Sequence, residues 1–201
     1  MIHIILDQSF TDKKFNDFAF KQKWELLGVF EADPDKGQAA QIVCSDPATK
    51  CRCYYVEDYL IDLRYLILEG KKEKELAENI FKAKGIKLII PEKIFSMVNK
   101  AKTRKDLVLG LRMLAVISPE QYEENFFNLF MIGLEHKDPF VRHASLKIVT
   151  YPSWKEFNMV VKEMSKNDPD PVVKETAQGF LKAYEQIHRK KKKKAAGKSK
   201  K

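Results

Sequence analysis

The hydrophobic residues of this chain follow a strand-like period in its first third and a helix-like period afterwards. Up to residue 70, short runs of β-branched and aromatic residues are separated by turn signals, which are clearest at residues 33–37 and 46–50. The runs occupy residues 1–6, 24–32, 40–44, 51–56 and 60–68. Closely spaced runs of this kind predict a small antiparallel sheet.

Residues 9–23 leave two alternatives open. Phe15 and Phe18 have helical spacing, whereas Phe18, Phe20 and the run into Trp24 alternate as they would in a strand.

From residue 71 onward, apolar positions recur at spacings of three and four, which predicts helices. Residues 71–84 form a charged amphipathic helix that ends at Gly85, and residues 91–117 form a hairpin of two helices. Residues 118–188 then predict two more hairpins, each joined at an Asp-Pro turn. Start signals for their helices are Ser118-Pro119, Asp138-Pro139, Ser153 with Glu156, and Asp170-Pro171.

The two Asp-Pro turns repeat with a spacing of 32 positions, and a basic residue follows each Asp by four places. The pattern Asp-Pro-x-Val-(Arg/Lys), followed by a small residue and then aliphatics, resembles the HEAT repeat family over roughly residues 118–188. The resemblance implies a short α-α superhelix. It also implies that the turn Asp and the basic residue pair within or between repeats, a role that would come to Asp138, Arg142, Asp170 and Lys174.

Arg142 and Lys174 have two interpretations. As exposed residues on a ridge of turns, they are candidate binding residues. In the structural interpretation, which we favour because the spacing recurs, Asp138 caps its own helix and Arg142 bonds a neighbouring acid or turn. Asp168 and Asp170 are expected to act as caps or to lie on a solvated face.

We therefore expect an α+β protein with three parts. Residues 1–70 form a small N-terminal antiparallel β-rich domain, and residues 71–188 form a HEAT-like helical-hairpin domain. Residues 189–201 form a disordered Lys-rich tail, because the segment has no apolar residue apart from two alanines.

The net charge of +9 belongs to that tail. The tail contains nine of the 37 basic residues and no acid, which leaves 28 bases against 28 acids in residues 1–188. Attraction for phosphate is therefore expected only from the tail, chiefly from Arg189, Lys190, Lys191, Lys192, Lys193 and Lys194.

The sequence offers little catalytic chemistry. It has no glycine-rich phosphate loop, no Gly-x-Ser-x-Gly and no His-Glu-x-x-His. Cys44, Cys51 and Cys53 are odd in number and match no common zinc spacing, so we expect strand residues in place of a disulfide framework or a metal site. We expect no cofactor and no catalytic residue.

A non-enzymatic protein-interaction or scaffold module built on helical repeats is the leading hypothesis. The alternatives are a nucleic-acid-associated protein that binds weakly and nonspecifically through its tail, and an enzyme or enzyme accessory of the HEAT-like lyase or glycosylase type. No membrane-spanning run and no signal peptide is found, so we expect a cytoplasmic protein.

Overall fold

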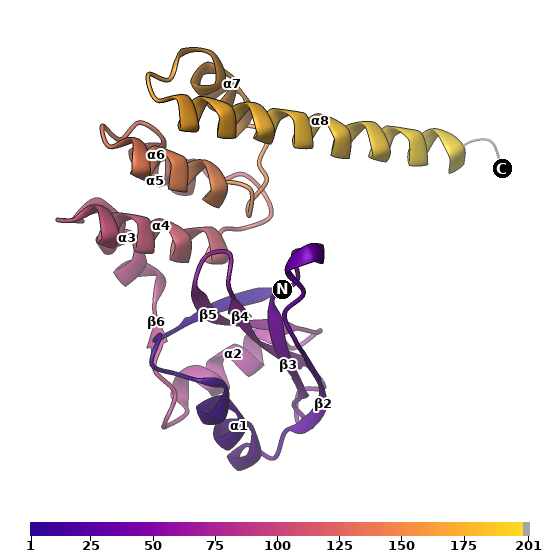
Figure 1. The fold of residues 1–201 in the computed structure, drawn as a ribbon. Helices are drawn as coiled ribbons and strands as arrows, with labels where there is room; N and C mark the ends of the chain where they lie inside the picture. Colours follow the sequence, from indigo (N-terminus) through magenta and orange to yellow (C-terminus); the bar gives the residue numbers. More distant parts are fainter. Residues whose placement is uncertain (199–201) are drawn as a thin grey trace. The chain divides into compact units, whose positions relative to one another are not determined.

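The computed structural model describes the backbone of residues 1–198 and the side chains of residues 1–184. An N-terminal antiparallel sheet is followed by several helices, which confirms the α+β class (Figure 1). The chain forms two compact units. The first comprises Met1–Met97 and Arg112–Ile117, and the second comprises Val98–Leu111 and the chain from Ser118 onward.

The first unit is built on a six-stranded antiparallel sheet with the strand order β2-β3-β4-β5-β1-β6. The strands are β1 (Ile2–Leu6), β2 (Glu25–Phe30), β3 (Ala40–Ser45), β4 (Arg52–Asp58), β5 (Leu63–Glu69) and β6 (Leu88–Ile89). A 3-10 turn, η1 (Pro34–Lys36), joins β2 to β3 and ends at Gly37, whose left-handed φ of 66° suits glycine.

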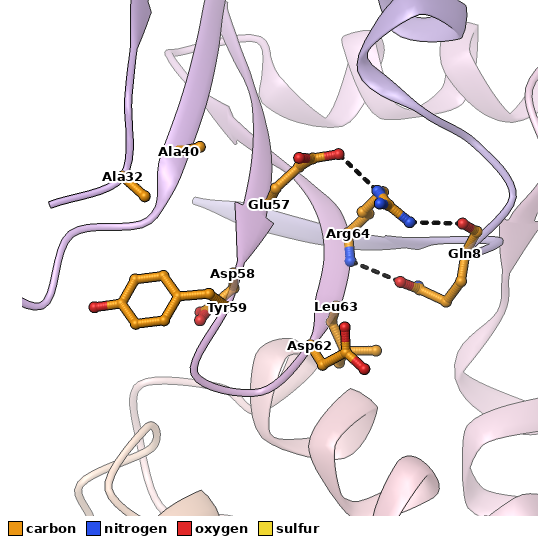
Figure 2. Close-up of a pocket in the computed structure, with 9 residues that line it drawn as sticks. All are labelled: Gln8, Ala32, Ala40, Glu57, Asp58, Tyr59, Asp62, Leu63 and Arg64. Carbon is orange, nitrogen blue, oxygen red and sulfur yellow. Dashed lines mark hydrogen bonds and ion pairs between the residues drawn. The ribbon is translucent and has the colours of Figure 1, made fainter. Parts of the chain in front are cut away.

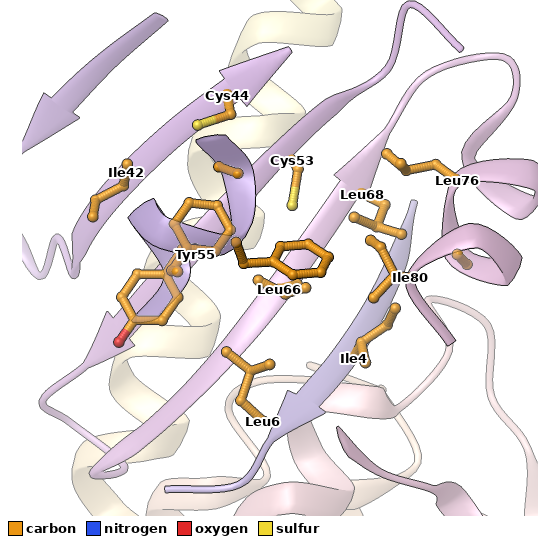
Figure 3. Packing of buried hydrophobic residues seen from close by; sticks show 14 of the residues in the cluster. Ile4, Leu6, Ile42, Cys44, Cys53, Tyr55, Leu66, Leu68, Leu76 and Ile80 are labelled. Carbon is orange, nitrogen blue, oxygen red and sulfur yellow. The ribbon is translucent and has the colours of Figure 1, made fainter. Parts of the chain in front are cut away.

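One face of this sheet forms the core of the first unit. Ile42, Tyr55, Leu66 and Ile4 are neighbours across four strands, and they pack under α1 (Asp12–Lys21) and α2 (Glu73–Lys82) (Figure 3). Segment 9–23 is therefore helical. Thr11 caps α1, which turns Phe15 and other apolar side chains towards the sheet.

The first unit extends beyond the predicted boundary at residue 70. Leu76, Ala77 and Ile80 of α2 belong to the sheet's core, and β6 pairs with β1. Helices α1 and α2 both pack on the core face of the sheet, so part of its cover comes from beyond residue 70.

The remaining helices are α3 (Pro91–Asn99), α4 (Arg104–Ile117), α5 (Glu124–Leu134), α6 (Pro139–Ile148), α7 (Phe157–Asn167) and α8 (Pro171–Lys198). The starts predicted at the Asp-Pro turns are confirmed. Asp138 accepts a hydrogen bond from the amide of Phe140 at 2.9 Å, and Asp170 accepts one from the amide of Val172 at 2.9 Å.

The starts predicted at Ser118 and Ser153 are wrong, because α5 and α7 begin several residues later. The carbonyl of Pro119 accepts a hydrogen bond from Trp154 Nε1 at 3.1 Å, and Ser153 has a φ of 52° and donates to the carbonyl of Thr150. Trp154 also stacks on Phe157. Packing of the indole outside the helix therefore overrides the local capping signals.

Helix α8 runs from Pro171 to Lys198 and so includes most of the segment that the sequence predicts as a disordered tail. The side chains predicted to contact anions, Arg189 and Lys190 to Lys194, lie outside the described residues. No helix in the described part of the chain is long and apolar enough to cross a membrane.

Candidate functional site

Strand β2 is an open edge of the sheet. It pairs with β3 on one side, and no other strand among the described residues pairs with its outer side. Exposed fractions are 58% for Leu26, 47% for Leu27, 63% for Val29 and 57% for Phe30. Edge strands are normally protected by charges, prolines or bulges, and β2 has only Glu25 and an irregularity at Leu27.

An apolar groove lies beside this edge. It has a volume of about 130 Å³ and is bordered by Val29 and Phe30 of the β2 edge and by Ile42 and Tyr55 from the neighbouring strands. Three acidic residues also line it, namely Asp12, Glu31 and Glu57, together with Ala40 and Gln41. No lysine or arginine lines this groove, so its lining carries three acidic side chains and no basic one.

A second, more polar pocket adjoins the groove, since Ala40 and Glu57 line both cavities (Figure 2). Its volume is about 260 Å³. The other residues that line it are Gln8, Ala32, Asp58, Tyr59, Asp62, Leu63 and Arg64. Acids therefore outnumber bases in both cavities.

The only base of the pocket, Arg64, is already engaged. Its Nε donates to Glu57 Oε1 at 2.6 Å, and its Nη1 donates to the carbonyl of Gln8 at 2.7 Å (Figure 2). The Tyr55 hydroxyl donates to the same Glu57 oxygen at 2.8 Å.

These bonds fix the ionisation of the cluster. Burial alone would raise the pKa of Glu57, but the hydrogen bonds from Arg64 and Tyr55 outweigh it and lower the pKa. Burial, followed by the bond to Glu57, raises the pKa of Tyr55. Near neutral pH the site therefore presents a carboxylate and a neutral phenol, which suits binding of a cation better than proton transfer.

The structure gives Arg142 a structural position. It is 9% exposed, and its Nε and Nη2 donate to the two carboxylate oxygens of Asp168, each at 2.8 Å. Its Nη1 donates to the carbonyls of His136 and Lys137. The hydrogen bond from Arg142, which outweighs burial, lowers the pKa of Asp168.

Arg142 therefore bonds a neighbouring acid, as the structural interpretation expects, in place of the pairing with Asp138 that the resemblance allows. Asp138 instead caps α6 and lies 3.5 Å from Arg104 Nη1. Lys174 is half-buried, and its charge also lowers the pKa of Asp168.

Sequence reasoning predicted a neighbouring acid or turn for Arg142 without naming Asp168, and it missed the β2 edge. The doubled Asp-Pro at residues 168–171 was one usable signal for a buried acid. The other was the apolar run from Leu26 to Phe30, which has no charge to guard an edge.

Cys44, Cys51 and Cys53 are buried free thiols in the core of the first unit. Burial raises the pKa of Cys44 and, more strongly, that of Cys53, which makes the thiolate unfavourable. In the described part of the chain, no group of three or more histidine, cysteine or acidic side chains is arranged to hold a metal ion.

Comparisons with protein-family models, with curated proteins and with solved structures found no match for this chain.

Proposed function

We propose that the protein is a non-enzymatic protein-binding module and that its binding surface is the edge of β2. The observation that carries this proposal is the exposure of four large apolar side chains, Leu26, Leu27, Val29 and Phe30, on a strand with an open outer side. An extended segment of another protein that added to this edge would hydrogen-bond to its backbone and cover its side chains.

The energetic gain from such an addition is substantial. Full burial of one exposed aliphatic or aromatic side chain contributes about 1.5 to 3 kcal/mol. Cover of Val29 and Phe30 would therefore offset a large part of the entropy lost on association. The groove beside β2 would take an alternate side chain of the added strand, which is how strand addition acquires specificity.

The helical hairpins support a scaffold role. The pattern of residues 118–188 resembles HEAT repeats, whose function is commonly to present surfaces to protein partners. Arg142 and Asp168 are buried within this region, so they would stabilise the scaffold and would not contact the partner.

The test is capture of partners from source lysate by the full chain and by two variants. Val29→Lys places a charge on the β2 edge, and Phe20→Lys is the control, because Phe20 is also exposed in the same unit but lies on α1. We expect Val29→Lys to lose its specific protein partner and Phe20→Lys to retain it. Equal retention by both variants would contradict the proposal.

A second candidate function is nucleic-acid association through the tail, favoured by the nine basic residues (arginine and lysine) in residues 189–201. Titration with duplex DNA, with and without those residues, tests it. The logarithm of the affinity should fall steeply with the logarithm of the salt concentration, and the binding should disappear on truncation. Binding that survives truncation would rule out the tail as the contact.

A further inference from the structure

We infer that the segment captured at β2 is an extended peptide in which apolar residues alternate with arginine or lysine. This inference rests on the proposed function and adds the chemistry of the partner. It follows from the acids that surround the groove and the adjoining pocket, since neither the apolar edge nor the acids alone would specify an occupant.

Both apolar and acidic side chains line the groove. Val29, Ile42 and Tyr55 contribute apolar surface, while Asp12 and Glu31 lie at the same cavity. Arginine and lysine bury an aliphatic stem and keep the charged head near water or an acid. A long basic side chain therefore matches this cavity better than an aliphatic or an acidic one.

The adjoining pocket offers a second position for a basic group. Glu31 lines the groove and the next residue, Ala32, lines the pocket, so the two cavities follow one another along the chain just after β2. The exposed Asp62 lines this pocket and is the acid that a ligand can reach. Arg64 is already bonded to Glu57, and the buried Asp58 accepts hydrogen bonds from the Leu60 amide and the Tyr65 hydroxyl. Residues i and i+2 of an added strand share one face and lie roughly 7 Å apart. Two basic residues at this spacing would reach both cavities.

A second copy of the chain would meet like charges in one register of the edge. An antiparallel pair of β2 strands centred on Gly28 would place Glu25 of each copy opposite Glu31 of the other. Like charges directly opposite one another destabilise a strand pair. A segment with basic residues at these places would instead make favourable pairs.

The experiment uses the full-length protein and three fluorescent peptides of roughly eight residues, an ordinary strand length. They share alternating valine and threonine residues and differ at two same-face positions, which carry arginine, glutamine or glutamate. Binding is measured by fluorescence anisotropy at low and high salt. We expect the arginine peptide to bind about tenfold more tightly than the glutamate peptide at low salt, since each exposed ion pair is weak and salt screens it.

Variants of the protein locate the effect. Glu31→Gln should reduce the ratio of the affinities for the arginine and glutamate peptides. Glu175→Gln is the control, because Glu175 is an exposed acid on α8, and it should leave this ratio unchanged. Val29→Lys should weaken binding of the arginine and glutamine peptides, because it removes shared apolar surface and adds a positive charge to the groove.

The outcomes separate the two proposals. Equal binding of all three peptides, abolished by Val29→Lys, would leave strand addition standing and overturn the basic partner. Failure of every peptide to bind, with partner capture from lysate unaffected by Val29→Lys, would overturn both. A concentration-dependent dimer that Val29→Lys abolishes in sedimentation would show that the occupant is a second copy, and would also overturn the inference.

Discussion

Each compact unit of the protein contains an arginine bonded to a carboxylate, and the two pairs differ in burial. The side chains of Arg142 and Asp168 are 11% and 4% exposed, whereas those of Arg64 and Glu57 are 33% and 39% exposed. The first pair closes a turn within the helical unit, and the second lies where two cavities meet beside an open strand edge.

The difference shows how burial changes the effect of the same chemical groups. A buried pair is costly to break, because removal of one partner leaves an uncompensated charge away from water. A half-exposed pair contributes little to stability, since water and salt screen it, but its field remains available to a ligand. We therefore expect Arg142 and Asp168 to govern stability and Glu57 to govern recognition.

The largest expected effect is on the buried pair. Asp168→Ala should lower the free energy of unfolding by about 3 to 5 kcal/mol, because it strands the Arg142 guanidinium. Urea unfolding followed by Trp154 fluorescence measures this, in a Trp24→Phe background so that the signal comes from the helical unit. If Asp168→Ala lowered the free energy of unfolding by less than Glu57→Gln does, the buried pair would not be the more important one for stability.

A smaller effect is expected where helices of the second unit approach closely. A Cβ built on Gly133 would lie 2.2 Å from Ser145 Oγ and 2.5 Å from Leu111 Cδ1, so Gly133→Ala should cost about 1 to 3 kcal/mol. Gly179→Ala is the control. Apart from the nearby backbone of α8 itself, no described atom lies within 4 Å of the added Cβ there, and the change should stabilise α8 by about 0.5 to 1 kcal/mol. Thermal melts of both variants check the sign of each effect.

Acid should weaken the helical unit through Asp168. Its pKa in the folded protein lies below the ordinary value of 3.8, so its contribution is complete above the unfolded pKa and is lost as pH falls through the folded pKa. Unfolding free energies should therefore fall between about pH 5 and pH 2. Asp168→Asn should show a shallower decline, and an identical pH profile would assign the acid sensitivity to other carboxylates.

The smallest effect on stability is expected at the half-exposed pair. Glu57→Gln should cost no more than about 1 kcal/mol, because the pair is partly solvated. The same change should weaken binding of the arginine peptide, since it removes one carboxylate from both cavities. A melting temperature equal to that of the wild type, together with reduced peptide affinity, would support a role of Glu57 in recognition alone. A large loss of stability would contradict the comparison of the two pairs.

The sequence predicts the helices and strands of this fold better than it predicts which of them lie side by side. Strand runs and turns are readable because alternation and β-branched residues act locally, and Asp138 and Asp170 cap their helices as expected. The signals at Ser118 and Ser153 fail because Trp154 packs in the loop between helices, and a distant contact of this kind leaves no local pattern.

The candidate site depends still more on long-range contacts. Glu57 and Arg64 lie on adjacent strands, and Gln8 bonds to Arg64 from a position 56 residues away. Strand order, which places β2 at the edge, follows from tertiary packing, and the alternation of residues 24–32 alone is the same for an edge and a central strand. Arg142 was recognisable from its turn, but its partner Asp168 lies 26 residues further on.

The three buried thiols allow opening of the first unit to be measured by chemical labelling. Cys44, Cys51 and Cys53 are 2% exposed or less, and the helical unit has no cysteine. A thiol-directed reagent can modify the native protein only when the sheet unit transiently opens, so the rate of labelling counts those openings. Opening that is confined to the helical unit leaves the labelling rate unchanged. The rate of thiol labelling therefore measures opening of the first unit separately from opening of the second.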